Sequence, residues 1–359
     1  MKKIVRWSAV SAALVLALTA CGDAPEDEET DAGGTATSGS GETYKACAVL
    51  DVGGVDDRSF NQSVWLGLQN AQEELGEDRL EISYVQSQSE ADYEPNLRTQ
   101  AESCDGVIAT GALLIEATGT VAPEFPDVDF LQIDGPSTAD NVYGAQYYTE
   151  QSGFLGGYLA ASLSQTGAIG TWGGINVGRG VTGYMEGYRL GAEYYNQQKG
   201  AAVRVLGWDG TDGTFAGTFT EAPVGRSTSE ALISQGADII FPVAGGAGTG
   251  AFTAAEAAGG SVSVIWVDFP GCEFYAEYCS YIPTSVLKGI PQNIVDYFTE
   301  AVEGEAPTGD YEGTLENGGT DIDVFNQFED RVSDETKAEL ETIRQSIIDG
   351  TIEVPRVSG

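Results

Sequence analysis

Residues 51–65, DVGGVDDRSFNQSVW, place side chains that could hold a flat polar ligand at a strand-to-helix turn. Asp51 follows a short apolar run, two glycines allow a tight backbone, and Phe60 and Asn61 stand where a helical pattern begins. An aromatic ring can stack on a planar heterocycle, and a carboxylate and an amide can pair with its polar edge. The same residues could instead serve the fold alone, with Phe60 in the core, Asn61 as a helix cap and Asp51 in solvent.

A glycine-rich segment, FPVAGGAGTGA (241–251), follows a second strand-like run and opens a helix. Its residues Gly246 to Ala251 fit the pattern G-x-G-x-x-A, and Asp268 stands 22 residues after Gly246 (268 − 246). This spacing formally matches a dinucleotide-binding fingerprint, so an NAD-dependent oxidoreductase is an alternative function. Glycines at a helix N-terminus could equally let the backbone approach another kind of ligand.

Two charged residues end strand-like runs in the second half of the chain. Asp268 closes WVD, and Lys288, one of only four lysines after residue 20, closes TSVLK. A carboxylate can accept hydrogen bonds from two sugar hydroxyls, and an ammonium can donate to a hydroxyl or a ring oxygen. Lys288 could also be an ordinary exposed lysine.

The chain contains no histidine, which removes the usual general base of serine and cysteine hydrolases and the commonest zinc ligand. No phosphate-loop lysine motif, HExxH, CxxC or GxSxG occurs either. We therefore expect a binding protein that is not an enzyme, with no cofactor and no metal.

The N-terminus carries an export pattern. A basic MKKIVRW precedes an apolar run that is shorter than the roughly 20 residues of a membrane span, which predicts a signal peptide over residues 1–20. The end LTAC, followed by Gly22, resembles a bacterial lipobox, so Cys21 would be lipidated and would anchor the protein to the cell membrane outside the cytoplasm. An ordinary cleaved signal with an incidental cysteine is the alternative. Residues 21–43 have no large aliphatic side chain and should form a disordered tether.

The exported chain is strongly acidic. Removal of residues 1–20 leaves 14 basic residues (17 − 3) against 55 acidic ones, a net charge of −41 (14 − 55). Such a surface repels nucleic acid and anionic lipid, so we expect no nucleic-acid partner. A solvated surface adapted to salt would have the same composition.

Besides Cys21, the chain has four cysteines, an even number that suggests two disulfides outside the cytoplasm. Cys47 and Cys104 each stand at the start of a strand-like run, while Cys272 and Cys279 flank a short loop. These positions favour the pairs Cys47–Cys104 and Cys272–Cys279. A zinc site built from the four thiolates is the rival interpretation.

From residue 44 onward, strand-like runs such as ACAVLD, LEISYV, DGVIAT and DFLQID alternate with amphipathic stretches, and the alternation restarts after residue 146. This order predicts an α/β fold of two lobes with parallel sheets flanked by helices and a cleft between the lobes. The predicted lobes are 44–148 plus about 275–308, and 149–270 plus about 309–352. Ligands of open α/β sheets bind beyond the carboxyl ends of the strands, where Asp51 and Asp268 stand.

Together these segments resemble the basic membrane protein family, the purine-nucleoside-receptor lipoproteins that feed ABC importers. The resemblance covers about residues 46–350. The matching segments are DVGGVDDRSFNQSVW, FLQID, YYTEQSGFLGGYLAA, GYMEGYRLGAEYYN, ALISQGADIIFPVAGGAGTGA, WVD and TSVLK. It implies a type I periplasmic-binding-protein fold, in which two α/β lobes joined by three crossovers close on a ligand.

The resemblance also implies roles for individual residues. Asp51 and Asn61 would hydrogen-bond a base, and Phe60 and Phe241 would sandwich it. The sugar contacts would come from three further residues, Gly246, Asp268 and Lys288. Asp134, which ends FLQID, matches the family less closely, and Pro270 departs from it, since many members have a polar or acidic residue there.

The implied function is that of a monomeric, lipid-anchored solute-binding protein that delivers a nucleoside to an ABC permease and ATPase complex. A ligand-sensing lipoprotein of the same fold, without transport, is the alternative.

Overall fold

The computed structural model describes residues 43–357. The predicted signal peptide, Cys21 and nearly all of the predicted tether therefore lie outside the described residues. Within residues 43–357, no helix is both long enough and apolar enough to cross a bilayer.

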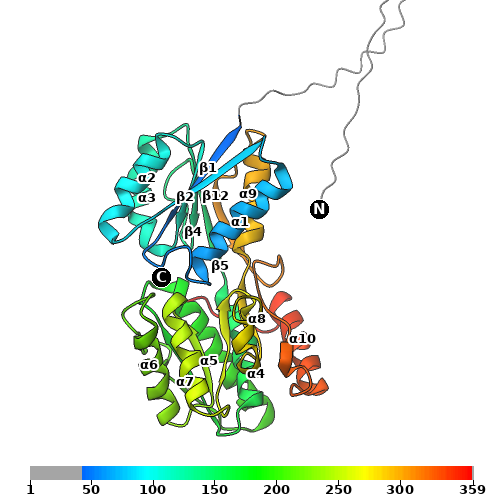
Figure 1. Ribbon diagram of the computed structural model, residues 1–359. Helices are drawn as coiled ribbons and strands as arrows, with labels where there is room; N and C mark the ends of the chain where they lie inside the picture. The colour runs from blue at the N-terminus through cyan, green and yellow to red at the C-terminus, as the bar shows by residue number, and fades with distance from the viewer. Residues whose placement is uncertain (1–42, 358–359) are drawn as a thin grey trace, which may run out of the picture. The chain divides into compact units, whose positions relative to one another are not determined.

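The first lobe is built on a six-stranded parallel sheet with the strand order β12-β5-β4-β3-β1-β2. Helices α1 and α9 lie side by side against one face, and α2 and α3 cover the other (Figure 1). The strands are β1 Tyr44–Leu50, β2 Leu80–Gln86, β3 Gly106–Thr110, β4 Asp129–Ile133, β5 Val142–Tyr147 and β12 Gly309–Gly313; the helices are α1 Phe60–Leu75, α2 Tyr93–Ala101, α3 Ile115–Val121 and α9 Ile290–Ala301.

Strand β1 shows why this sheet is covered on both faces. Ala46, Ala48 and Leu50 pack in the cluster that contains α1 and α9, whereas Cys47 and Val49 pack in the cluster that contains α2. Because successive side chains point to opposite faces, a continuous apolar run suits a strand with helices on both sides.

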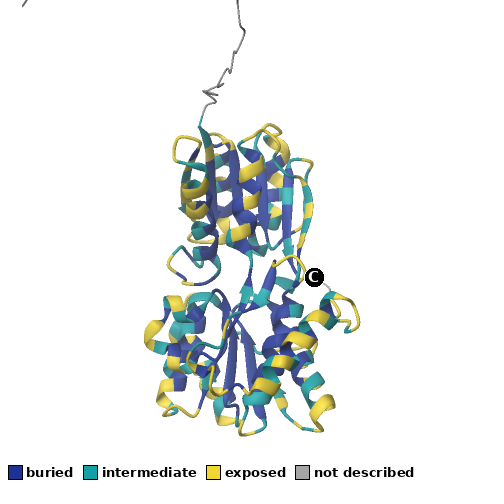
Figure 2. Ribbon diagram, turned by 90° about the vertical axis from the view of Figure 1, so that its right-hand side faces the viewer, coloured by how far each residue is buried: buried dark blue, intermediate teal, exposed yellow. Residues whose placement is uncertain are grey.

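The second lobe has a four-stranded sheet, β7-β6-β8-β9, next to a three-stranded sheet, β10-β11-β13, with β8 in contact with β10. Its central strands β6 and β8 are buried throughout, whereas the edge strand β7 is not, and exposed residues lie mainly on the helices and loops (Figure 2). The strands are β6 Ala168–Gly173, β7 Arg204–Leu206, β8 Ile239–Val243, β9 Ser263–Val264, β10 Trp266–Asp268, β11 Ser285–Lys288 and β13 Thr320–Ile322; the helices are α4 Thr149–Leu163, α5 Arg179–Lys199, α6 Ala222–Ser234, α7 Gly250–Ala257, α8 Gly271–Phe274 and α10 Asp334–Ile348.

The chain passes between the lobes three times, between β5 and α4, between β11 and α9, and between β12 and β13. The two later boundaries differ from those predicted. Residues 275–288 belong to the second lobe because β11 pairs with β10, and residues 309–313 belong to the first lobe because β12 pairs with β5. The run GDYEG of β12 lacks the apolar pattern of a buried strand because it lies at the edge of its sheet.

Helices α4 and α5 approach closely enough to require glycine at their contact. A Cβ atom on Gly157 would lie 2.0 Å from the Tyr188 carbonyl oxygen, and one on Gly191 would lie 1.9 Å from that of Phe154. The glycines in YYTEQSGFLGGYLAA and GYMEGYRLGAEYYN therefore fix the position of α5, which carries Tyr184 to the site described below.

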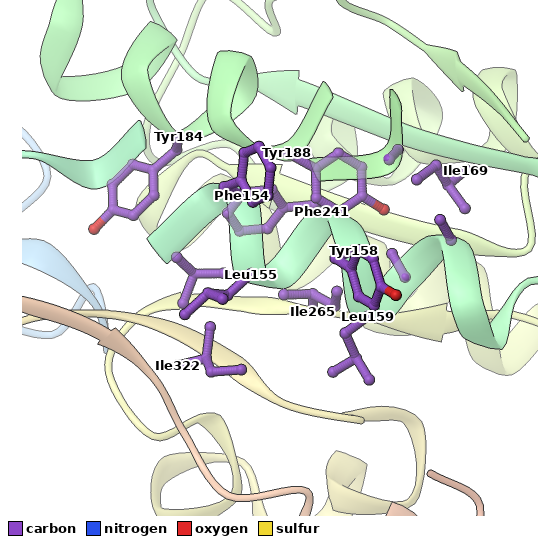
Figure 3. Close-up of a cluster of buried hydrophobic side chains, with 14 of the residues drawn as sticks. Phe154, Leu155, Tyr158, Leu159, Ile169, Tyr184, Tyr188, Phe241, Ile265 and Ile322 are labelled. Atoms are coloured by element: carbon purple, nitrogen blue, oxygen red, sulfur yellow. The ribbon is translucent and has the colours of Figure 1, made fainter. Parts of the chain in front are cut away.

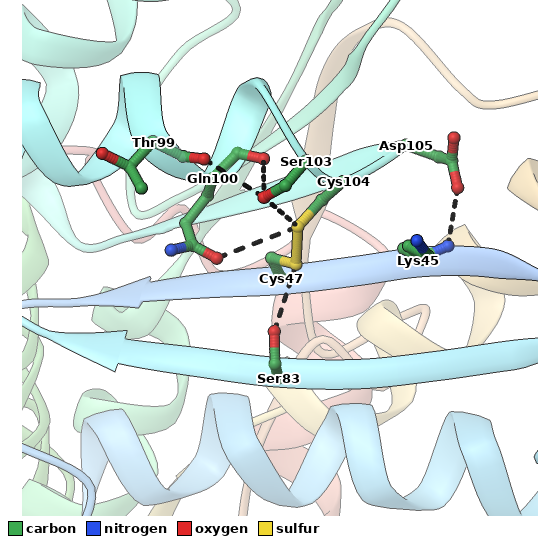
Figure 4. Close-up of a disulfide and its surroundings, with 8 residues drawn as sticks. All are labelled: Lys45, Cys47, Ser83, Thr99, Gln100, Ser103, Cys104 and Asp105. Carbon is green, nitrogen blue, oxygen red and sulfur yellow. Dashed lines mark hydrogen bonds between the residues drawn. A yellow bond between two sulfur atoms is a disulfide. The ribbon is translucent and has the colours of Figure 1, made fainter.

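Two disulfides join the predicted pairs of cysteines, Cys47–Cys104 and Cys272–Cys279. The first joins β1 to Cys104, two residues before β3, and the Ser83 hydroxyl donates a hydrogen bond to Cys47 Sγ (Figure 4). The second closes a loop after β10. Because these cysteines are bonded to one another, the zinc-site alternative is wrong.

Candidate ligand-binding site

A cavity with about 570 Å³ of empty space, part of it open to solvent, lies where carboxyl ends of strands from both lobes meet. Six of the eight predicted ligand-binding residues contribute to its wall: Asp51, Phe60, Asn61, Asp134, Asp268 and Lys288. The wall further includes Gly53, Asp57, Gly111, Ala112, Leu113, Val177, Gly180, Val181, Tyr184, Phe219, Val243, Ala244 and Gly245.

Asp51 follows β1. One of its carboxylate oxygens accepts hydrogen bonds from neighbouring residues, and the other is available to a ligand. Its Oδ1 accepts hydrogen bonds from the Gly53 amide at 2.8 Å and from Asn61 Nδ2 at 2.7 Å. Its Oδ2 accepts none from residues 43–357 and points toward Gly111, where a Cβ atom would stand 3.4 Å away. Burial raises the pKa of Asp51, and the hydrogen bonds from Asn61 and Gly53 oppose that rise.

The Phe60 ring is the aromatic wall beside Asp51. Phe60 is the first residue of α1 and is only partly buried, so its ring borders the cavity without belonging fully to the core. A Cβ atom on Gly111 would meet the Phe60 ring at 2.9 Å, so glycine at 111 leaves room for the ring.

Lys288 joins the lobes through a buried ion pair. Its Nζ lies 2.7 Å from Asp134 Oδ2 and 3.7 Å from Asp268 Oδ1, and its side chain is 1% exposed. The rings of Phe60, Tyr147 and Tyr184 surround the ammonium at 5.0, 5.8 and 5.1 Å. Burial raises the pKa of Asp134, and the charge of Lys288 opposes that rise.

Asp268 is held by hydroxyls from both lobes. The Tyr184 hydroxyl donates to Oδ1 at 2.8 Å, and the Ser59 hydroxyl donates to Oδ2 at 2.8 Å. Asp134 and Asp268 both have left-handed backbone, with φ of 57° and 66°. This conformation is uncommon for residues other than glycine and is concentrated at functional sites, which supports a role for both aspartates.

The structure does not bring Phe241 or Gly246 to the cavity wall. Phe241 is 0% exposed and packs among core residues of the second lobe, with its ring centroid 5.2 Å from that of Tyr188 and 6.1 Å from that of Tyr184 (Figure 3). It lies within β8 on the same face as Val243, which does line the cavity, but it is two residues further from the carboxyl end of the strand and packs against Tyr184 and Tyr188 of α5. At the glycine segment, Gly245 rather than Gly246 lines the cavity.

Phe219 supplies a further aromatic side chain of the wall, beside those of Phe60 and Tyr184, and the sequence prediction missed it. It lies in the irregular segment before α6 and is partly buried. The sequence did contain a signal for this residue. Phe219 stands in GTFTEAP, just before a helix with a proline in its first turn, and Phe60 likewise stands at the start of a helix, α1.

The glycine segment has a structural explanation other than dinucleotide binding. The Ala247 amide donates to the Phe219 carbonyl oxygen at 2.9 Å, and a Cβ atom on Gly246 would lie 3.3 Å from that oxygen. A Cβ atom on Gly250 would lie 2.2 Å from the Ala222 carbonyl oxygen. These glycines therefore let the backbone of Phe219 and of the start of α6 pack closely against the segment, which explains them without a bound dinucleotide.

Comparison with known proteins agrees with this architecture. Residues 44–358 match the ABC transporter substrate-binding proteins described as PnrA-like. The chain belongs to this family. The family is one of solute-binding proteins, so the oxidoreductase alternative is not favoured.

The relatives include the ABC transporter nucleoside-binding protein BmpA of Lactococcus lactis, which is 31% identical over 99% of both chains. Basic membrane protein A of Borreliella burgdorferi is 28% identical over 88% of both chains. Among solved structures, a solute-binding protein of an ABC transporter system from Aeropyrum pernix has a TM-score of 0.78 and 26% identity, covering 87% of this chain and 94% of its own.

Proposed function

We propose that this substrate-binding protein takes a purine nucleoside into the interlobe cavity and delivers it to an ABC permease and ATPase complex. The observation that carries the proposal is the open Oδ2 of Asp51 beside the Phe60 ring, since a planar base with an N–H donor can stack and hydrogen-bond there together. Asp134, Asp268 and Lys288, at the ends of β4, β10 and β11, offer acceptors and a donor to ribose hydroxyls.

The charge of the cavity supports a nucleoside over a nucleotide. Its wall carries four carboxylates, those of Asp51, Asp57, Asp134 and Asp268, against the single ammonium of Lys288. Lys288 is already paired with Asp134, so a phosphate group would enter an uncompensated negative field. An uncharged ligand with several donors fits this wall better than a nucleotide or a dinucleotide cofactor.

We further propose that Cys21 anchors the protein by lipid to the outer face of the cell membrane and that the protein acts as a monomer. The sequence supports the anchor through LTAC, and three relatives from Pyrococcus species are named lipoproteins. Binding would then favour the arrangement in which the lobes meet, and this arrangement would dock on the permease. A sensor lipoprotein would use the same cavity, and genes for a permease and an ATPase beside this one would distinguish the importer.

Calorimetric titration of the delipidated protein with adenosine, guanosine, inosine and uridine tests the ligand class. We expect micromolar or tighter binding of one purine nucleoside. Guanosine 5′-monophosphate and NAD serve as comparison ligands, and we expect both to bind at least tenfold more weakly. Equal or tighter binding of either phosphate-bearing ligand, or no binding of any nucleoside, would contradict the proposal.

A further inference from the structure

Asp57 is a buried carboxylate in the cavity wall that the ligand contacts proposed above do not use. Its Oδ1 accepts hydrogen bonds from the amides of Ser59 at 2.9 Å and Gln62 at 3.1 Å. Its Oδ2 accepts from the amide of Asn61 at 2.8 Å and from Asn61 Nδ2 at 3.0 Å. A carboxylate has about four lone-pair positions, so Asp57 has no acceptor left for a ligand.

Asn61 has likewise committed its side-chain donors. One hydrogen bond from its Nδ2 goes to Asp57 Oδ2, and another goes to Asp51 Oδ1. Its Oδ1 accepts from the Asp51 amide at 3.1 Å. The Asn61 side chain therefore lies between the two carboxylates and holds Asp51 at its backbone and at one oxygen.

The backbone between Asp57 and α1 is shaped for this arrangement. Arg58 has a left-handed φ of 48°, which is uncommon for a residue other than glycine. The residues after it, Ser59, Asn61 and Gln62, all direct their amides at the Asp57 carboxylate. The turn thus gathers the first donors of α1 on one side chain, which then orients Asn61.

We propose that Asp57 is a positioning residue of the ligand site, which acts through Asn61 to keep Asp51 Oδ2 open to the ligand. This inference rests on the proposed nucleoside function and deepens it. It makes Asp51 the carboxylate that contacts the ligand and Asp57 the neighbour that only orients Asp51. It also gives Asn61 an orienting role through its side-chain donors, which leaves one lone pair of its Oδ1 for a donor on the base.

The test uses two probes that differ in the donor offered to Asp51. Inosine has an N–H on the edge of its base, and purine riboside lacks it. In Asp57→Asn, one oxygen becomes an amino group that faces amide donors, so the contacts to Asn61 or to the α1 amides are lost. We expect inosine affinity to fall roughly ten- to hundredfold and purine riboside affinity to change less than about threefold.

A second substitution shows whether the loss of inosine affinity in Asp57→Asn depends on Asp51. In an Asp51→Asn background, Asp57→Asn should cause no further loss of inosine affinity. Asp56→Asn is the matched control, because Asp56 is the exposed neighbour, carries the same charge and lies outside the cavity wall. We expect its affinities to stay within about twofold of those of the unmodified protein.

A purely structural role for Asp57 predicts a different outcome. Asp57→Ser keeps one side-chain oxygen that can accept from an amide of the turn but cannot also hold the Asn61 side chain, so it covers the case in which Asp57→Asn does not fold. Equal losses for inosine and purine riboside in either variant, or a loss that persists in the Asp51→Asn background, would overturn the proposal.

Failure of the nucleoside function would be seen separately, as absence of binding of both probes to the unmodified protein. Positioning can then be measured without ligand by NMR, through hydrogen exchange of the Asn61 side-chain amide. We expect exchange to be slow in the unmodified protein and at least tenfold faster in Asp57→Ser. Unchanged exchange would overturn the positioning role.

Discussion

At the scale of single residues, burial separates phenylalanines that the sequence could not distinguish. Phe60 and Phe219 are partly buried and border the cavity, whereas Phe241 is completely buried against Tyr184 and Tyr188. A ring at the wall can stack on a ligand, while a ring in the core contributes to folding.

Phe60→Ala and Phe219→Ala should each weaken binding of the preferred nucleoside by about fivefold or more. The reason is the loss of one stacking face, worth roughly 1–3 kcal/mol. Calorimetric titration measures the affinity, and thermal unfolding of the ligand-free protein should show little change. A large fall in the melting temperature would mean that the ring is part of the core.

Phe241→Ala should show the opposite pattern. Truncation of a fully buried phenylalanine is expected to lower the free energy of unfolding by about 3–5 kcal/mol. Urea unfolding of the ligand-free protein measures this loss. An unchanged stability with a selective loss of binding would restore Phe241 to the ligand site.

Binding should weaken on acidification because Asp51 must offer its charged oxygen to the ligand. Burial raises the pKa of Asp51, so its protonation begins at a higher pH than that of an ordinary aspartate. We expect affinity to fall as the pH is lowered through that raised pKa. The Asp51→Asn variant should bind weakly with a flatter pH profile. An unchanged profile would mean that another group controls the effect, such as Asp57, whose pKa burial raises to about 7.

At the scale of elements, the residues at the carboxyl ends of strands were predictable. Asp51, Asp134, Asp268 and Lys288 close strand-like runs, and the topology of parallel sheets brings such positions to one edge. Phe241 lies inside β8, two residues before the cavity-lining Val243, and a run that is buried throughout does not reveal at which residue the core ends and the cavity begins. Phe219 lies in an irregular segment, whose course depends on contacts with the glycine segment that follows β8.

The contact between α4 and α5 gives a prediction at this scale. Gly157→Ala should lower the melting temperature by several degrees, because its Cβ atom would lie 2.0 Å from the Tyr188 carbonyl oxygen, and α5 must move. Gly119→Ala in α3 is the matched control, since its nearest neighbour would be Thr138 at 3.5 Å and alanine favours a helix by about 0.5–1 kcal/mol. Equal effects of the two substitutions would contradict the close approach of the helices.

At the scale of the whole chain, sequence patterns predicted the two α/β lobes but not the later crossovers. The edge strand β12 has little apolar signal, and β11 is assigned to its lobe only by pairing with β10.

The segment after α10 forms further contacts between the lobes. Ile352 and Val354 pack against the core of the second lobe, and Arg356 then reaches the first lobe, where it donates to Glu312 of β12 at 2.8 Å and to Gln146 of β5 at 3.1 Å.

Removal of this tie should make the lobes separate more readily. The guanidinium of Arg356 also lies 4.2 Å from the centre of the Tyr148 ring, and the Val357 amide donates to the buried carboxylate of Glu150. These contacts form only when the two lobes lie against each other. A chain that ends at Val354 lacks them and should therefore favour an arrangement in which the lobes are further apart. We expect a larger radius of gyration in small-angle scattering without ligand and an affinity lowered several-fold.

The point variant Arg356→Gln should have a smaller effect, about twofold in affinity, because its ion pair is partly exposed and such pairs contribute about 1 kcal/mol or less. Arg226→Gln is its control, since Arg226 pairs with Glu230 within α6 alone and joins no two lobes. If the truncated chain keeps both the radius and the affinity of the full chain, the segment after α10 packs on the lobes without influencing how they open.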